Sequence, residues 1–108
     1  MKTKLLATLF VAATTISLSA ADVKEIWAKD CQKCHGEDGK GQTKMGAKAG
    51  VKDYTDAKVQ AEMKDENAVK AIKEGIKADG KEKMKGYADK VNDEEIKALI
   101  AHMRSFKK

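Results

Sequence analysis

The clearest hydrophobic pattern lies at the end of the chain. Between Asn92 and Phe106, apolar residues recur every three or four positions, and most of the residues between them are charged. This spacing predicts an amphipathic helix with one inward face. The face comprises Ile96, Leu99, Ile100, Met103 and Phe106. Asn92 and Glu95 are spaced as a capping box, so we expect the helix to begin directly after Asn92.

Weaker helical patterns occupy earlier parts of the chain. A helix is predicted from Asp22, because Asp22 and Glu25 also have the spacing of a capping box. Its apolar face comprises Val23, Ile26, Trp27 and Cys31. Two shorter helices are expected in the middle of the chain, one over Asp56–Met63 and one with Asp65 as its N-cap and Gly75 in the C′ position.

The remaining stretches have no helical period. Glycines interrupt residues 36–50 and residues 77–90, and we expect both stretches to be loops. Val69 and Ile72 of the helix before the second loop are expected to face inward, with Ile76 closing the same face. No stretch alternates apolar and polar residues as a half-buried strand does. The chain is therefore predicted to be all-α, with three to five helices.

The first 21 residues have the composition of a secretory signal. Lys2 and Lys4 precede a 14-residue apolar stretch (5–18), and Ser-Ala-Ala follows it. We expect cleavage after Ala21, with cleavage after Ala20 as the alternative. The apolar stretch is short for a membrane span, and no basic cluster follows it. A soluble periplasmic protein without a membrane anchor is therefore predicted.

The mature region would be residues 22–108, which is the size of one small domain. Removing 21 of the 108 residues leaves 87, with 20 basic and 17 acidic residues and a net charge of +3. Charges of both signs are interspersed, which is typical of a solvated surface and gives no indication of nucleic-acid binding. The region has four aromatic residues. Its core is therefore thin for its length, and a covalently bound apolar group would add to it.

Residues 31–36 are Cys-Gln-Lys-Cys-His-Gly, which fits the C-x-x-C-H pattern of covalent haem attachment. On a helix, Cys31 and Cys34 project from one face, so both sulfurs can reach the two vinyl groups at one porphyrin edge. His35 follows at once, so its imidazole can be the proximal ligand of the iron. Gly36 has no Cβ, which lets the chain leave the helix close to the ring.

With these residues the chain resembles the class I cytochromes c, in particular small bacterial members with one haem. The resemblance covers nearly all of residues 22–108, including Gly-Glu-Asp-Gly-Lys-Gly after the haem motif, Met-Lys-Gly-Tyr at 84–87 and the closing helix. It implies a cytochrome c-like fold wrapped around one haem c, which two thioether links join to Cys31 and Cys34. It also implies that Trp27 packs between the terminal helix and the haem, and that residues 51–55 approach the haem propionates.

The same resemblance implies that Met84 is the second axial ligand of the iron. Met84 lies in a predicted loop, 49 residues after His35, and no apolar period around it would make it a core residue. Met103 differs, because it lies on the inward face of the last helix and is expected in the core. The alternatives to Met84 are Met45, Met63, Met103 and His102.

One feature of the family pattern is missing. The chain has no proline, although the family commonly has one after the haem motif, where its carbonyl accepts the N–H of the proximal histidine. Such partners fix the orientation of the imidazole and tune the metal. We therefore expect another backbone carbonyl, between Gly46 and Lys52, to accept a hydrogen bond from His35.

Together these predictions indicate an electron carrier and not an enzyme, because a methionine in the sixth position closes the iron to substrates. One alternative is a five-coordinate or bis-His haem protein that acts as a small-ligand sensor or a peroxidase-like enzyme. The other is a haem-free thiol or zinc module built from the two cysteines and two histidines. The expected partners of the monomeric carrier are larger redox proteins. They would dock weakly on the lysines around Met84, which are Lys81, Lys83, Lys85 and Lys90.

Overall fold

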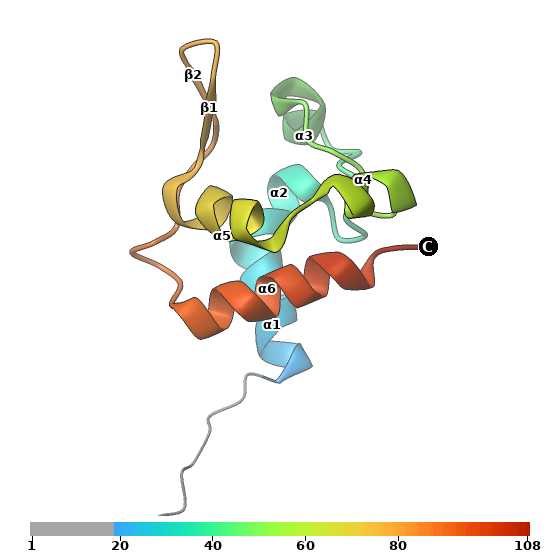
Figure 1. Ribbon diagram of the computed structural model, residues 1–108, viewed down its shortest axis with the longest axis vertical. Coiled ribbons are helices and arrows are strands. Elements are labelled where there is room, and N and C mark those ends of the chain that lie inside the picture. Colours follow the sequence, from blue (N-terminus) through green and yellow to red (C-terminus); the bar gives the residue numbers. More distant parts are fainter. Residues whose placement is uncertain (1–18) are drawn as a thin grey trace, which may run out of the picture.

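The structure is a computed structural model that describes residues 19–108, so most of the predicted signal sequence lies outside the described residues. The described chain is mainly helical and carries one two-stranded hairpin (Figure 1). Its elements are α1 (Ala20–Ile26), the π-helix η1 (Trp27–Cys31), α2 (Gln32–His35), α3 (Lys44–Ala49), α4 (Ala57–Glu62), α5 (Asp65–Glu74), β1 (Ile76–Ala78), β2 (Lys81–Met84) and α6 (Asp93–Ser105). The prediction of an all-α fold class is confirmed, with the hairpin as a local addition.

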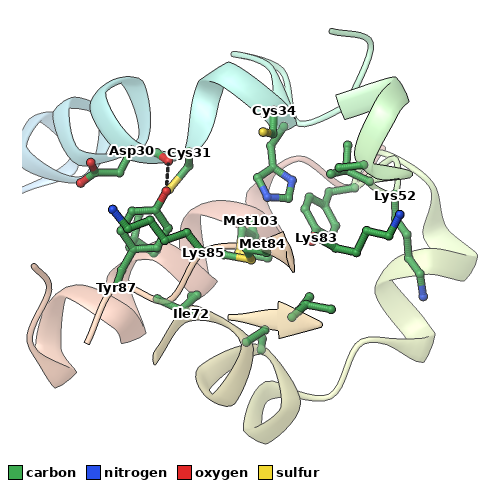
Figure 2. A pocket seen from close by; sticks show the side chains of 18 of the residues that line it. Asp30, Cys31, Cys34, Lys52, Ile72, Lys83, Met84, Lys85, Tyr87 and Met103 are labelled. Carbon is green, nitrogen blue, oxygen red and sulfur yellow. Dashed lines mark hydrogen bonds between the residues drawn. The ribbon is translucent and has the colours of Figure 1, made fainter. Parts of the chain in front are cut away.

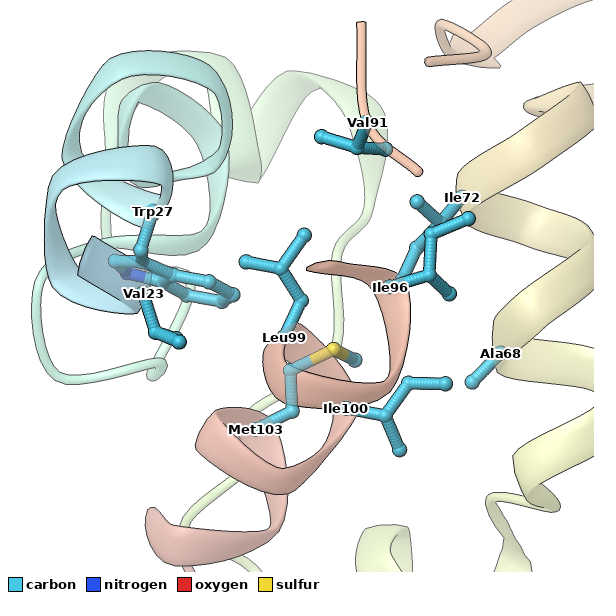
Figure 3. Close-up of a cluster of buried hydrophobic side chains, with 9 residues drawn as sticks. All are labelled: Val23, Trp27, Ala68, Ile72, Val91, Ile96, Leu99, Ile100 and Met103. Atoms are coloured by element: carbon cyan, nitrogen blue, oxygen red, sulfur yellow. The ribbon is translucent and has the colours of Figure 1, made fainter. Parts of the chain in front are cut away.

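The core lies where α6 packs against α1 and α5 (Figure 3). The capping box of Asn92 and Glu95 is present, as predicted, and starts α6. Ile96 and Leu99 are 1% and 2% exposed, and burying a side chain of this size contributes roughly 1.5–3 kcal/mol to folding. The buried cluster comprises Val23, Trp27, Ala68, Ile72, Val91, Ile96, Leu99, Ile100 and Met103. Phe106 is half-buried at its edge.

The first helix begins earlier than predicted. Ser19 is the N-cap of α1, and its side chain and that of Asp22 form the capping box. The predicted pairing of Asp22 with Glu25 is therefore wrong in the chain as described, because Ser19, also a favoured N-cap residue, precedes Asp22 by three positions and forms the capping box with it. The predicted cleavage after Ala21 falls inside the first turn of α1, and it stays a prediction.

The expected loop over residues 36–50 contains a helix, α3. Thr43 caps it, since its side chain accepts a hydrogen bond from the backbone N–H of Gly46, and Gly50 ends it in the left-handed conformation. Hydrophobic periodicity gave no sign of α3, because the helix has six residues and a glycine in its middle. The cap and the terminal glycine were the available signals.

The predicted loop from residue 77 to 90 is also wrong in its first half, where β1 and β2 pair antiparallel. Asp79 and Gly80 form the two-residue turn between them, with φ of 53° and 72°. Asp-Gly with positive φ at both positions is typical of a type I′ hairpin turn. The strands carry mostly charged, exposed side chains. Their sequence therefore lacks the alternation of apolar and polar residues by which a strand is predicted.

Two predicted central helices are present. α4 has Asp56 as its N-cap, and α5 begins at Asp65 and ends before Gly75, which has a φ of 79°. The prediction of Asp65 as the N-cap is wrong, because Lys64 occupies that position and Asp65 is the first helical residue. Ile72 of α5 is buried and Val69 is half-buried, as expected. Ile76 does not close this face: it is 45% exposed at the start of β1. Within residues 19–108, no helix has the length and apolar character needed to cross a membrane.

Candidate functional site

A cavity of about 810 Å³ lies between the helices and the hairpin. This volume is in the range that cofactor sites occupy, about 300–1,000 Å³. One side, the histidine wall (residues 27–36), contributes Cys31, Cys34 and His35. The facing side, the methionine wall (residues 68–87), contributes Ile72 and Met84. Figure 2 shows both cysteine side chains projecting from their helix beside this space, and Met84, the last residue of β2, reaching it from the other side.

The histidine wall is one continuous helical run with a wide turn in it. In η1 the backbone N–H of Gln32 bonds to the carbonyl of Trp27, five residues earlier. A π-turn of this kind often marks a functional site. Here the π-helix ends at Cys31, and α2, which follows directly, carries Cys34 and His35.

Gly36 ends this run as the sequence predicted. Its φ is 81°, in the left-handed region that favours glycine. The indole N–H of Trp27 donates to the carbonyl of Gly36 at 2.9 Å, and this hydrogen bond is buried. Trp27 therefore ties the end of the motif back to the helix that carries it, and it also lines the cavity. Its predicted position between the terminal helix and the site is confirmed.

The imidazole of His35 packs against two aromatic rings. Its centroid lies 5.6 Å from that of Trp27 and 5.5 Å from that of Tyr54. Burial lowers the pKa of His35, which favours the neutral form that coordinates metals. The sequence pointed to Tyr54 only as a possible propionate contact, so its packing on His35 is a contribution that the tertiary structure adds.

The expected backbone acceptor for His35 is not present in the described residues. Nδ1 of His35 is buried and has no hydrogen-bond partner, so the prediction of a carbonyl between Gly46 and Lys52 is wrong. A buried polar atom without a partner costs about 1–3 kcal/mol. In this structure the neighbouring aromatic rings, and not a hydrogen bond, hold the imidazole in place.

Thr43 supports the histidine wall from α3, and sequence reasoning missed this residue. Its hydroxyl donates to the carbonyl of Cys34 at 2.7 Å and accepts from the N–H of Gly46 at 2.8 Å. Gly46 itself leaves no room for a side chain, because a Cβ there would meet the carbonyl oxygens of Cys34 and Gly41. The only signal in the sequence was a threonine at the start of a short helix.

Cys31 has the character of a buried, unreactive thiol in the free chain. Burial, with the nearby Asp30 carboxylate, raises its pKa to about 12. A redox dithiol or a zinc site relies on thiolate, which needs a lowered pKa. The surroundings of Cys31 therefore argue against a redox dithiol or a zinc site. Residues 19–108 contain no group of three or more His, Cys, Asp or Glu side chains arranged to hold a metal ion.

Met84 ends β2 and is half-buried against the core cluster. The position of Met84 depends on close backbone contacts, because Gly75 and Gly86 let the chain at the end of the hairpin approach the end of α5. A Cβ at Gly75 would meet the carbonyl oxygen of Met84, and one at Gly86 would meet the carbonyl oxygen of Lys73 at 2.7 Å. Met84 thus lies at the end of a strand and not in the predicted loop.

All four methionines of residues 19–108 line the cavity, so proximity alone does not single out one of them. Met103 is 7% exposed and belongs to the core, as predicted, whereas Met45 is 45% exposed at the rim. Met63 follows α4, and its carbonyl accepts a hydrogen bond from Arg104. His102 does not line the cavity. Its ring packs edge-on against Trp27 and Phe106, with centroid distances of 5.2 and 4.8 Å.

The segment over residues 51–55 reaches the cavity only in part. Val51, Lys52 and Tyr54 line it. The hydroxyl of Thr55 instead donates to its neighbour Asp53 at 2.6 Å. Of the two side chains expected to contact propionates, Tyr54 is therefore placed toward the site and Thr55 is not.

The comparisons with known proteins agree with this geometry. The family model described as cytochrome c matches residues 20–107. The chain is similar to the solved structure of the KustC0563 c-type cytochrome, with 35% sequence identity and a TM-score of 0.70 over 79% of this chain and 96% of that one. A point mutant of the same protein gives 35% identity and a TM-score of 0.69, over 80% of this chain and 99% of that one. No curated protein matches the chain.

Proposed function

The chain belongs to the cytochrome c family, and from that premise we propose that it carries single electrons between larger redox proteins in the periplasm, through a haem with His35 and Met84 as axial ligands. The family is one of haem-based electron carriers, and its cofactor is a covalently bound haem c. Cys31 and Cys34 fit the attachment motif. Bound haem supplies one-electron chemistry, because its iron has stable ferrous and ferric states.

The observation that carries the proposal is the composition of the cavity. The attachment cysteines and a neutral imidazole lie on the histidine wall, and a thioether lies on the methionine wall. The cysteines fix one edge of the ring, so His35 is on the same wall as the covalent links. Met84 is a soft, neutral ligand that favours ferrous iron and raises the reduction potential. By filling the sixth position it also excludes small molecules from the iron.

The position of His102 supports methionine over histidine as the second ligand. His102 is absent from the cavity lining, and its ring packs against Trp27. A bis-His haem would require α6 to rearrange. The remaining alternative, a five-coordinate haem that binds a small ligand, requires that no methionine binds the iron.

The experiment is to replace Met84 with Ala in the haem-loaded protein. We expect the weak methionine-to-ferric-iron band in the far red to disappear, the reduction potential to fall, and carbon monoxide to bind the ferrous form readily. The matched controls are the same change at Met45, Met63 and Met103, and each should keep the band. Loss of the band in a control but not in the Met84 variant would contradict the assignment.

The proposed docking surface lies beside the cavity mouth. Lys83, Lys85 and Lys90 line the cavity, and Lys81 lies with Met45 beside a smaller hollow between the hairpin and α3. Glu82 lies among these lysines, so the attraction to an acidic partner is expected to be modest and easily screened. Electron-transfer rates with such a partner should fall as salt rises. A rate that is the same at low and physiological ionic strength would remove this part of the proposal.

Export to the periplasm rests on the N-terminal signal sequence. The predicted mature chain begins at Asp22, which could cap the shortened α1. Intact mass measurement of the haem protein purified from a periplasmic extract tests both export and the cleavage position. Haem protein that retains residues 1–21 in the cytoplasm would contradict the proposed location.

A further inference from the structure

A tyrosine links the two walls of the cavity. The hydroxyl of Tyr87 donates to the backbone carbonyl of Asp30 at 3.0 Å (Figure 2). In the part of the chain that the structure describes, this is the one hydrogen bond that joins residues 19–36 to residues 64–91. Asp30 lies in η1, directly before Cys31. The bond therefore ends on the same helical run that carries the attachment motif.

The other end of the link is fixed to α5. The backbone N–H of Tyr87 donates to the carbonyl of Ile72 at 2.7 Å, and that of Ala88 donates to the carbonyl of Lys73 at 3.3 Å. Tyr87 follows Met84 by three residues, and Gly86 between them packs its backbone against the end of α5. The chain from Met84 to Ala88 is thus attached to α5 by its backbone and to the histidine wall by the hydroxyl of Tyr87.

The surroundings of Tyr87 suit a hydrogen-bond donor. The ring is half-buried, lines the cavity and packs against the core cluster. The Nζ of Lys90 lies 5.8 Å from the ring centroid on its outer side. Burial raises the pKa of Tyr87, so the hydroxyl keeps its proton at neutral pH and can donate to the Asp30 carbonyl.

We propose that Tyr87 is a positioning residue for the methionine ligand, with its hydroxyl holding the Met84 segment at a fixed distance from the helix that carries His35. This inference deepens the proposed function and rests on Met84 being an axial ligand. A thioether binds iron weakly enough that its geometry matters. Loss of the hydrogen bond between Tyr87 and Asp30, which we call the Tyr87 tether, lets the Met84 segment move away from the haem without unfolding the core.

The test replaces Tyr87 with Phe in the haem-loaded protein and measures displacement of the methionine ligand by imidazole. Loss of one hydrogen bond between the walls should raise the apparent affinity of ferric iron for imidazole by about fivefold to tenfold. The far-red methionine band should also disappear at a lower temperature, before the loss of helical circular dichroism. The ring is kept, so packing in the cavity changes little.

A matched variant separates positioning from general stability. Ile96 is 1% exposed in the core and does not line the cavity, so Ile96→Val lowers the stability of the fold without touching the tether. Its imidazole affinity should equal that of the wild type. An unchanged affinity in Tyr87→Phe, or an equal rise in both variants, would overturn the inference. A wild type without the far-red band would overturn the Met84 assignment, and this inference with it.

Discussion

The two walls of the cavity are built in different ways. The histidine wall takes Cys31, Cys34 and His35 from five consecutive positions of one helical run, so helical spacing alone brings them together. The methionine wall places Met84 by means of α5, a hairpin and two close backbone approaches at glycines. The first wall is therefore defined locally, whereas the second depends on contacts between segments. Regions that depend on contacts between segments, such as the methionine wall, tend to open by local unfolding before the rest of the fold does.

The largest effect is expected when the covalent attachment on the histidine wall is removed. Replacing Cys31 and Cys34 with Ala together should leave a chain that holds no haem and is mostly disordered. Its nine-residue core cluster is small against the entropy of ordering the domain, about 1–2 kcal/mol for each residue. Far-ultraviolet circular dichroism and thermal melting provide the measurement. Native-like helical content with a cooperative melt would show that the polypeptide alone supports both walls.

An intermediate effect is expected at Gly75 on the methionine wall. Alanine there would hold a left-handed φ of 79° and place its Cβ against the carbonyl of Met84. We expect a loss of about 2–5 kcal/mol of unfolding free energy, from the backbone strain and the overpacking together. The far-red methionine band should weaken in the ferric protein. Gly80→Ala is the matched control, because Gly80 also has positive φ but no atom within 4 Å of the added Cβ.

The corresponding change on the histidine wall is Gly46→Ala. Its Cβ would meet the carbonyl oxygens of Cys34 and Gly41, and overpacking of this kind costs about 1–3 kcal/mol. The methionine band should nevertheless persist, since the thioether links keep His35 beside the ring. Denaturant unfolding measures the loss of stability, and the far-red spectrum separately measures whether the methionine band persists. If Gly46→Ala abolishes the band while Gly75→Ala keeps it, the contrast between the two walls is wrong.

The smallest effect concerns His102, which lies outside both walls. Burial against Trp27 and Phe106, and then the nearby charge of Lys24, lower its pKa from 6.5. The unfolded chain therefore binds the proton more readily, so stability falls as pH drops below about 6.5 and levels off below the folded pKa. His102 is only partly buried, and the expected loss is under about 1 kcal/mol.

His102→Phe should reduce this dependence while keeping the aromatic contacts. Burial also lowers the pKa of His35, so that histidine contributes in the same pH window. The measurement is the free energy of unfolding of the haem-loaded protein between pH 7 and pH 5. The lowered carboxyl pKa values, those of Asp53 and Asp93, lie below 3.8 and do not contribute in this window. An equal slope in the wild type and the variant would assign the pH dependence to another group.

Local features of this protein were predictable from the sequence. The capping box of α6, its buried stripe and the attachment motif each depend on residues a few positions apart, and each was found where it was expected. α1 begins at Ala20 and not at Asp22, because its N-cap, Ser19, belongs to the predicted signal sequence. α3 and the hairpin were missed, because a short helix and an exposed ribbon need no regular apolar pattern.

The sequence by itself determined the cofactor, the attachment motif and the helical class, because helix geometry turns fixed spacing into fixed position. The tertiary structure decided what surrounds these residues. It packed Trp27 and Tyr54 against the His35 imidazole, left Nδ1 without a hydrogen-bond partner, and joined Tyr87 to Asp30 across 57 positions. Contacts at such separation depend on how whole elements pack, and no local pattern in a single sequence encodes them.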